Sequence, residues 1–323
     1  MSTAGFRHTP VLLDRCVELL SPALQEPGAV AIDATLGLGG HTEALLAACP
    51  GARVVGIDRD AEAIRLAGER LDVAGDRFAS HHATYDDIAG ALATVEATHA
   101  DAILFDLGVS SLQIDEADRG FSYAQDAPLD MRMNRDDPVT AASLLATESE
   151  DELTRILHVY GEERFARKIA RSIVRRRESE PIERSAQLVD LVRACIPAAT
   201  RTPGSNPAKR TFQALRIAVN SELDVLEAAL VAAIDALRVG GRIVVLSYHS
   251  LEDRIVKHAF AEGTEIAVPP GMPVVPDDAQ PYLRLLTRGA EKAPEAEIEV
   301  NSRAKPVRLR AAERTRATPR RAA

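Results

Sequence analysis

The sequence predicts an α/β protein whose parallel, doubly wound sheet is interrupted by a helical insertion after the fourth strand. Strand-like and helix-like segments alternate through residues 29–107, which is typical of strands joined by crossover helices. Strand signals then stop through residues 109–238, where apolar residues recur at helical spacing. A strong strand signal returns at 242–248, so the sheet is expected to resume after the insertion.

The elements before the insertion follow from apolar periodicity and from the turn residues between them. The expected strands are 29–34, 53–57, 78–83 and 102–107, of which the third is the weakest. The expected helices are 42–48, 61–71 and 87–95, the first of which ends before Pro50 and Gly51.

The insertion begins with a loop-like stretch and continues as helices. Its expected elements are a loop over 109–136 and helices at 140–145, 149–173 with a break at Gly161, 185–195 and 211–238. Gly240 and Gly241 are expected to follow the end of the last helix. Beyond the strand at 242–248, residues 268–281 hold five prolines and are expected to be irregular, and 282–288 and 307–314 are predicted as antiparallel closing strands. The sequence therefore predicts a discontinuous domain of residues 1–110 and 217–323, and an insertion of residues 111–216.

A glycine loop follows the first strand and indicates a nucleotide-like ligand. Asp33 ends the strand, and Gly37, Gly39 and Gly40 follow it, which lets a ligand lie against bare backbone. The dinucleotide pattern G-x-G-x-x-G fails, because Thr42 stands at its third glycine. The acid followed by G-x-G-G instead resembles motif I of S-adenosylmethionine (SAM) methyltransferases.

Asp58 ends the second strand, where a carboxylate accepts hydrogen bonds from ribose hydroxyls. The alternatives are an ordinary glycine-rich turn, a dinucleotide-dependent oxidoreductase and a non-catalytic nucleotide-binding module.

The other strands are expected to bring further polar or aromatic side chains to the same edge of the sheet. Tyr85 follows the third strand, Asp106 and Ser110 the fourth, and His249 the fifth. Asp106 suits an adenine amino group or a substrate amine, and its alternative role is a helix cap. The segment from Asp126 to Asn134 is interpreted either as a loop that closes over a site or as a structural Asp–Arg contact.

The charge is distributed unevenly along the chain. The 323 residues carry a net charge of −9, and 46% of them are hydrophobic. Residues 164–177 nevertheless hold seven basic side chains and no acidic one, and residues 303–321 hold eight against one. Arg201, Lys209, Arg210 and Arg216 form a third acid-free run. Three such runs favour a nucleic-acid partner over solvated helix faces.

Three widely spaced cysteines give neither a disulfide framework nor metal-ligand spacing, so no metal site is predicted. The N-terminus lacks the apolar core of a signal peptide, and no apolar run approaches the roughly 20 residues of a membrane span. The protein is therefore expected to be cytoplasmic, without a membrane partner.

A series of long motifs closely resembles the MraW family of ribosomal RNA small subunit methyltransferases. They are Asp33-Ala-Thr-Leu-Gly-Leu-Gly-Gly-His-Thr42, Gly56-Ile-Asp-Arg-Asp60, Asp106-Leu-Gly-Val-Ser-Ser111, Arg119-Gly-Phe-Ser-Tyr123, Pro128-Leu-Asp-Met-Arg-Met133, Tyr160-Gly-Glu-Glu-Arg-Phe-Ala-Arg-Lys-Ile-Ala170, Arg210-Thr-Phe-Gln-Ala-Leu-Arg-Ile-Ala-Val-Asn220 and His249-Ser-Leu-Glu-Asp-Arg-Ile-Val-Lys257. The resemblance implies a Rossmann-like SAM-dependent methyltransferase sheet with a helical substrate-recognition insertion. It further implies methylation of N4 of one cytidine in the decoding region of bacterial 16S rRNA.

The resemblance also assigns ligand contacts to residues of this chain. It places SAM against Gly39, Gly40, His41, Asp58, Tyr85, Asp106 and Gln113. Position 85 is usually Phe in the family, and Tyr85 keeps the aromatic face. Where relatives tend to read Pro-Ala-Thr-Arg-Thr, this chain has Lys209 in place of the first Thr, a gain of charge. For the RNA, the basic residues predicted to contact phosphate are Arg167, Lys168, Arg171, Lys209 and Arg210.

The catalytic group is less sharply indicated than the cofactor site. The exocyclic amine of cytosine is a poor nucleophile, so the enzyme must hold it in line and accept its hydrogens. The Pro-Pro-aromatic motif of many amino-methyltransferases is missing after Asp106, so the predicted acceptors are Asp106 or a carbonyl of 107–109, with Asp130 and Ser110 behind them. A DNA or small-molecule amino-methyltransferase is the alternative.

The expected partner is 16S rRNA in the small ribosomal subunit, and the oligomeric state, monomer or homodimer, is left open. Tyr123 or Phe121 is predicted to stack on a cytidine splayed out of its stack of bases.

Overall fold

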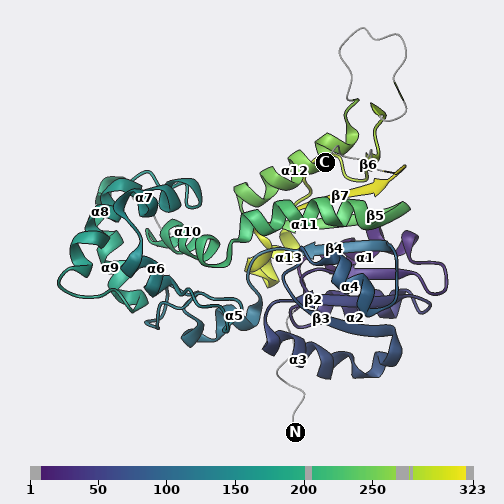
Figure 1. The fold of residues 1–323 in the computed structure, drawn as a ribbon, viewed down its shortest axis with the longest axis horizontal. Coiled ribbons are helices and arrows are strands. Elements are labelled where there is room, and N and C mark those ends of the chain that lie inside the picture. Colours follow the sequence, from purple (N-terminus) through teal and green to yellow (C-terminus); the bar gives the residue numbers. More distant parts are fainter. Residues whose placement is uncertain (1–8, 201–205, 267–275, 277–278, 318–323) are drawn as a thin grey trace. The chain divides into compact units, whose positions relative to one another are not determined.

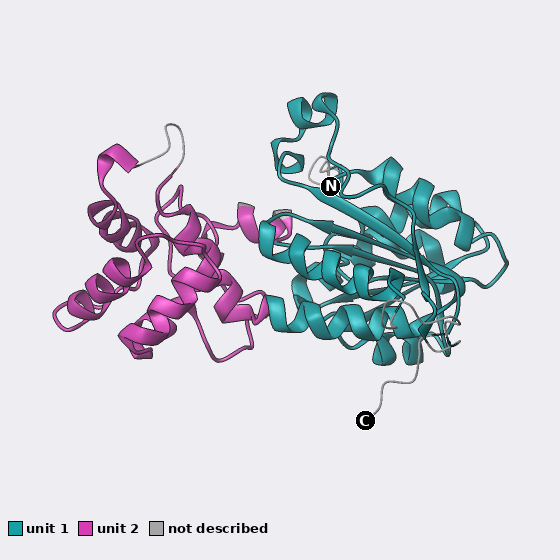
Figure 2. Ribbon diagram, turned by 90° about the horizontal axis from the view of Figure 1, so that it is seen from above, with its two compact units in different colours: residues 1–108, 223–323 teal, residues 109–222 magenta. Residues whose placement is uncertain are grey.

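A computed structural model describes residues 9–200, 206–266, 276 and 279–317. The chain divides into two compact units, residues 1–108 with 223–323 and residues 109–222 (Figure 2). The sequence-based boundary between 216 and 217 would cut helix α10 (Lys209–Asn220), which lies whole in the second unit.

Unit 1 contains a seven-stranded sheet in the order β3-β2-β1-β4-β5-β7-β6 (Figure 1). The strands are β1 (Val30–Asp33), β2 (Arg53–Asp58), β3 (Phe78–His82), β4 (Ala100–Asp106), β5 (Leu237–Ser247), β6 (Leu283–Leu285) and β7 (Arg308–Arg314). The first five pair in parallel, and β7 lies antiparallel to both β5 and β6. The predicted parallel sheet, its weak third strand and the antiparallel closing pair are therefore confirmed.

Helices cover both faces of this sheet. Successive side chains along each buried strand point to opposite faces, so each face has its own hydrophobic core under its helices. Ala31 packs on one face with α1 (Leu13–Leu20), α2 (Gly40–Ala48) and α3 (Ala61–Leu71). Val30 and Ile32 pack on the other with α4 (Ile88–Thr94), α11 (Glu222–Ala236) and α12 (Ser250–Thr264). Burial on both faces explains why these strands read as continuous apolar runs.

Unit 2 is helical, as the sequence predicts for the insertion. Its helices are α5 (Ser111–Asp115), α6 (Ala141–Thr147), α7 (Glu150–Val159), α8 (Ala166–Arg177), α9 (Ser185–Cys195) and α10. Their apolar faces form a separate core that includes Leu153, Ile169 and Leu188. Ser149 caps α7, and the chain breaks before α8, as expected near Gly161.

The single helix predicted over 211–238 is wrong, because the structure divides it into α10 and α11. Ser221 between them adopts a left-handed conformation with φ of 50°. The buried amide of Asn220 donates to the Met131 carbonyl and accepts from the Met133 N–H, both at 2.8 Å. The apolar periodicity continues across this one-residue break, so it could not reveal the turn. Gly240 and Gly241, expected after a helix end, lie within β5.

Within the described residues four α-helices had no expectation from the sequence, namely α1, α5, α12 and α13 (Glu295–Val300), and α5 lies in the stretch 109–136 that was expected to be a loop. Three predicted features lie wholly or partly outside the described residues. They are most of the irregular loop expected over 268–281, Arg201, and the end of the basic segment at 318–323. All three cysteines are buried free thiols. Among the helices of the described residues, none is long and apolar enough to cross a bilayer.

Candidate cofactor and catalytic site

The carboxyl ends of the central strands of unit 1 bring three acidic side chains to one edge of the sheet. Asp33 ends β1, Asp58 ends β2 and Asp106 ends β4. Because parallel strands all point the same way, their C-terminal residues meet on the side where ligands of open α/β sheets bind.

The glycine loop between β1 and α2 has a backbone that only glycine adopts readily. Gly39 is the N-cap of α2 with φ of +75°, and a Cβ added there would lie 2.9 Å from the Leu71 Cδ1. Thr42, which replaces a dinucleotide glycine, is fully buried and its hydroxyl donates to the Asp33 Oδ2 at 2.7 Å. This bond ties α2 to the end of β1.

The Asp58 carboxylate is held by two backbone amides. The Gly37 N–H donates to Oδ2 at 2.8 Å, and the Asp60 N–H donates to Oδ1 at 2.9 Å. Burial raises the pKa of Asp58 to about 6, although both amide bonds lower it. A carboxylate has about four lone-pair sites, so each oxygen keeps capacity for a ribose hydroxyl.

Tyr85 lies just after β3 with its ring partly buried. Its ring meets that of Phe105 edge-on, with centroids 5.8 Å apart and planes at 87°. Phe105 is fully buried in β4, so the contact fixes an aromatic ring beside the strand ends, as an adenine neighbour requires.

Asp106 lies at the centre of a polar network within unit 1. The Tyr248 hydroxyl donates to its Oδ1 at 2.5 Å, and the His41 Nδ1 lies 3.7 Å from its Oδ2. The His41 Nε2 donates to the Val11 carbonyl at 3.1 Å, which fixes the ring. Burial raises the pKa of Asp106, and the nearby His41 and the Tyr248 hydrogen bond counteract part of this effect.

The remaining predicted residues of this site belong to unit 2 and are engaged in local contacts. Ser110 and Gln113 form a reciprocal capping box at the start of α5, in which each side chain accepts from the other's backbone N–H. Arg132 donates to both oxygens of Asp130, at 2.8 and 2.7 Å. Burial would raise the pKa of Asp130, but Arg132 holds it below its usual range. These contacts favour the structural Asp–Arg interpretation and a capping role for Ser110.

The five predicted RNA contacts differ in how free their charges are. Lys168 donates to the Cys195 carbonyl at 2.8 Å, and Arg210 donates to the Glu162 carbonyl at 2.7 Å. Arg171 lies 3.4 Å from Glu150. Arg167 and Lys209 are exposed. Two of the five are thus committed to backbone carbonyls of their own unit.

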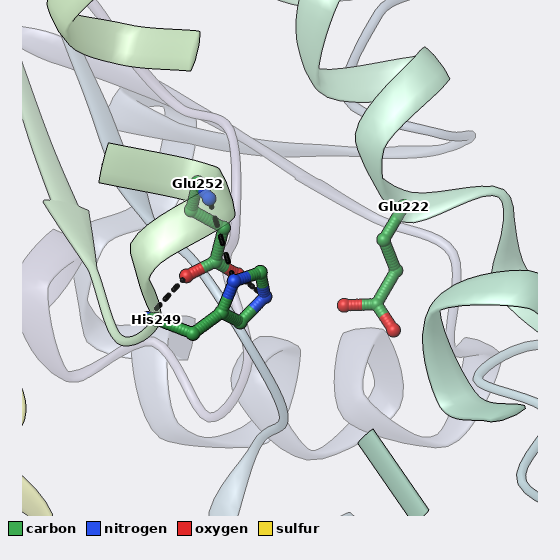
Figure 3. Close-up of side chains that lie close together, drawn as sticks. All are labelled: Glu222, His249 and Glu252. Carbon is green, nitrogen blue, oxygen red and sulfur yellow. Dashed lines mark hydrogen bonds and ion pairs between the residues drawn. The ribbon is translucent and has the colours of Figure 1, made fainter. Parts of the chain in front are cut away.

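His249 caps α12 rather than standing free at the strand end. Figure 3 shows its ring beside the Glu252 carboxylate, with the Nε2 and Oε1 atoms 3.1 Å apart. Glu222, also drawn there, belongs to the other unit and pairs with Arg216 at 2.8 Å.

Sequence reasoning assigned no role to Tyr248 or Glu252. The sequence signal that could have indicated Tyr248 is its aromatic side chain directly after β5, the strand with the strongest sequence signal.

The architecture is that of a Rossmann-like methyltransferase. It combines a parallel sheet in this strand order, helices on both faces, an antiparallel β7, and strands that end in acidic residues around a glycine loop. The model of the MraW methylase family matches residues 5–315, so the chain belongs to that family. The predicted fold class and family are both confirmed.

Curated relatives cover nearly the whole chain. A ribosomal RNA small subunit methyltransferase H of Frankia alni is 61% identical, covering 97% of this chain and 96% of its own. That of Streptomyces avermitilis is 59% identical, covering 96% and 98%. Among solved structures, a putative methyltransferase from Streptococcus mutans in complex with SAH is 11% identical with a TM-score of 0.43, covering 95% of this chain and 99% of that one.

Proposed function

We propose that this protein transfers a methyl group from SAM to the exocyclic N4 amine of a cytidine in the decoding region of 16S rRNA. The observation that carries the proposal is the near-complete coverage by relatives named ribosomal RNA small subunit methyltransferase H, at about three residues identical in five. We place the reaction in the cytoplasm and on rRNA within the small ribosomal subunit.

The residues at the strand ends fit SAM. Asp58 would accept from the ribose hydroxyls, Tyr85 would lie beside the adenine, and Gly39, Gly40 and His41 would border the ligand. Bound SAM supplies an electrophilic methyl group and carries no phosphate, so a loop shaped by glycines suffices. Gln113 remains a proposed contact, although its side chain already caps α5.

Asp106 is the best acceptor for the amine hydrogen among the three side chains considered. The lone pair of the amine is delocalised into the cytosine ring, so an acceptor on its N–H raises its nucleophilicity and takes up developing charge. Burial raises the pKa of Asp106, which makes it a stronger base. Asp130 is neutralised by Arg132, and Ser110 is occupied as a cap.

Helix α8 offers the RNA a line of arginines. Arg167, Arg171 and Arg175 recur four residues apart and are exposed, so they share one face of the helix, and the exposed Arg164 lies in the turn just before it. Within the described residues no carboxylate lies at ion-pair distance from Arg164, Arg167 or Arg175. The opposite face, with Ile169 and Ile173, is buried in the unit's core. Unpaired guanidinium groups on a rigid helix suit phosphate recognition.

The test is methyl transfer from radiolabelled SAM to small ribosomal subunits that lack the modification, followed by nucleoside mass analysis. Label is expected as N4-methylcytidine, and Asp58→Ala and Asp106→Ala are expected to abolish it. Protein that binds SAM but labels only DNA or a small acceptor, and neither subunits nor naked 16S rRNA, would overturn the proposal.

Neighbouring arginines give a matched test of the RNA face. Arg175→Ala removes a free charge, whereas Arg176→Ala removes one that is paired with Glu180. Only Arg175→Ala is expected to weaken rRNA binding and to lower its salt slope by about one unit. Equal effects of both substitutions would contradict the proposed face.

A further inference from the structure

Tyr248 is fixed in place by the start of helix α12. It follows β5 directly, and its N–H donates to the Glu252 Oε2 at 2.7 Å. The same oxygen accepts the His249 N–H at 3.1 Å, and Glu252 is only 3% exposed. A buried carboxylate that binds two successive amides leaves the Tyr248 backbone little freedom.

The ring of Tyr248 is equally constrained. It packs against the core cluster of α1 and α2, and its Cδ2 would lie 3.6 Å from a Cβ at Gly108, so the ring rests beside that glycine. The hydroxyl reaches the Asp106 Oδ1 at 2.5 Å. A short bond to an ionised acceptor is stronger than one between neutral groups.

The Asp106 carboxylate thus has a different neighbour on each oxygen. Tyr248 takes Oδ1, while Oδ2 faces His41 at 3.7 Å, beyond hydrogen-bond distance. The Asp106 N–H donates to the Thr35 Oγ1 at 2.6 Å, which fixes the backbone. With the backbone and Oδ1 held, Oδ2 is the carboxylate oxygen without a hydrogen bond among the described residues, and the side chain is still 24% exposed to a ligand.

We propose that Tyr248 is a positioning residue, whose hydroxyl fixes the Asp106 carboxylate with Oδ2 presented to the bound cofactor and the target amine. The proposal rests on the function proposed above for Asp106. The proposal requires that the hydrogen bond from Tyr248 to Asp106 persist in the ligand-bound enzyme. Without it the carboxylate could rotate and present either oxygen, and ligand binding would then cost the entropy of fixing the side chain.

Several charged or titratable groups face Asp106 and must be kept constant in the test. They are Cys16 on α1, Asp33 on β1, His41 on α2 and Glu252 on α12. None of these is altered by Tyr248→Phe, which removes the hydroxyl and retains the ring. Tyr282→Phe is the matched control, since its partly buried ring packs on the opposite core cluster.

The experiment measures SAM affinity by calorimetry and the kcat and KM of methyl transfer as functions of pH. Tyr248→Phe is expected to weaken SAM binding or kcat/KM about tenfold, with the melting temperature little changed. Its acid limb should move to higher pH, because the lost donor favoured ionised Asp106. Tyr282→Phe should leave the SAM affinity, kcat/KM and the acid limb unchanged.

A double-mutant cycle separates positioning from a general structural effect. In an Asp106→Asn background, Tyr248→Phe should have little further effect on SAM affinity. A full tenfold loss in that background, or an unshifted acid limb, would refute the positioning role. SAM binding is read without RNA, so these results stand even if no rRNA is methylated. Unchanged SAM binding and transfer in Asp106→Asn would instead reject the role proposed for Asp106 itself.

Discussion

Acidification is expected to weaken SAM binding through Asp58. The ribose hydroxyls need an ionised acceptor, and the pKa of Asp58 is raised to about 6 by burial. With that pKa the ionised fraction falls from about 0.97 at pH 7.5 to about 0.09 at pH 5.0. If only the ionised form binds, the Kd for SAM rises roughly tenfold over this interval. Asp106, whose pKa is also raised, adds to the change in the same direction.

This loss of affinity should not come from unfolding. The carboxyl of Asp58 has a pKa near 3.8 in the unfolded chain and about 6 in the folded one, so burial of its charge destabilises the native state above pH 6. That cost, at most roughly 3 kcal/mol, is relieved as the pH falls from 6 towards 3.8. Asp58 therefore makes the apo-protein relatively more stable at pH 5 while it binds SAM less well.

Calorimetric titration of SAM at constant ionic strength between pH 7.5 and 5.0 measures the effect, with thermal unfolding of the apo-protein alongside. Asp58→Asn should bind weakly at pH 7.5 and show a much flatter pH dependence. A wild-type Kd constant within about twofold across the range, from folded protein, would refute the reasoning that ionised Asp58 binds the ribose.

Two further predictions concern the loop and the turn between the helices. Gly39→Ala should lower the free energy of unfolding by about 1–2 kcal/mol and weaken SAM binding, because its φ is +75° and the new Cβ meets Leu71; urea unfolding and SAM titration measure both. Asn220→Ala should cost about 2–4 kcal/mol, because it leaves the Met131 carbonyl and the Met133 N–H buried without their partner; urea unfolding measures this too.

Each of these two substitutions has a control in the same unit. Gly68 lies within α3 with no atom within 4 Å of an added Cβ, so Gly68→Ala should stabilise by about 0.5–1 kcal/mol. Among the described residues the Gln213 side chain makes one hydrogen bond, to the Tyr160 carbonyl at 3.1 Å, so Gln213→Ala should lower the free energy of unfolding less than Asn220→Ala. If Gly39→Ala matched Gly68→Ala, or Gln213→Ala matched Asn220→Ala, the conformational arguments would fail.

The alternation of strands and helices, the glycine loop and the acid-tipped strands were all readable from the sequence. They are local patterns: a buried parallel strand needs a continuous apolar run, and Asp58 ends its strand by chain order alone. The family could likewise be inferred from motifs such as Asp33–Thr42, and the match over residues 5–315 confirms it.

Only the tertiary structure decided which polar side chains form hydrogen bonds with partners that are distant in the chain. Arg132 lies two residues from Asp130, so the sequence could suggest that pair, whereas Tyr248 is distant in the chain and reaches Asp106 only in the folded unit. Lys168 likewise reads in the sequence as one cation of a basic run, but in the structure its ammonium group donates to the carbonyl of Cys195 at the end of α9. Sequence periodicity reports which face of an element is buried, whereas the partner of a polar atom depends on segments that only folding brings within 3 Å.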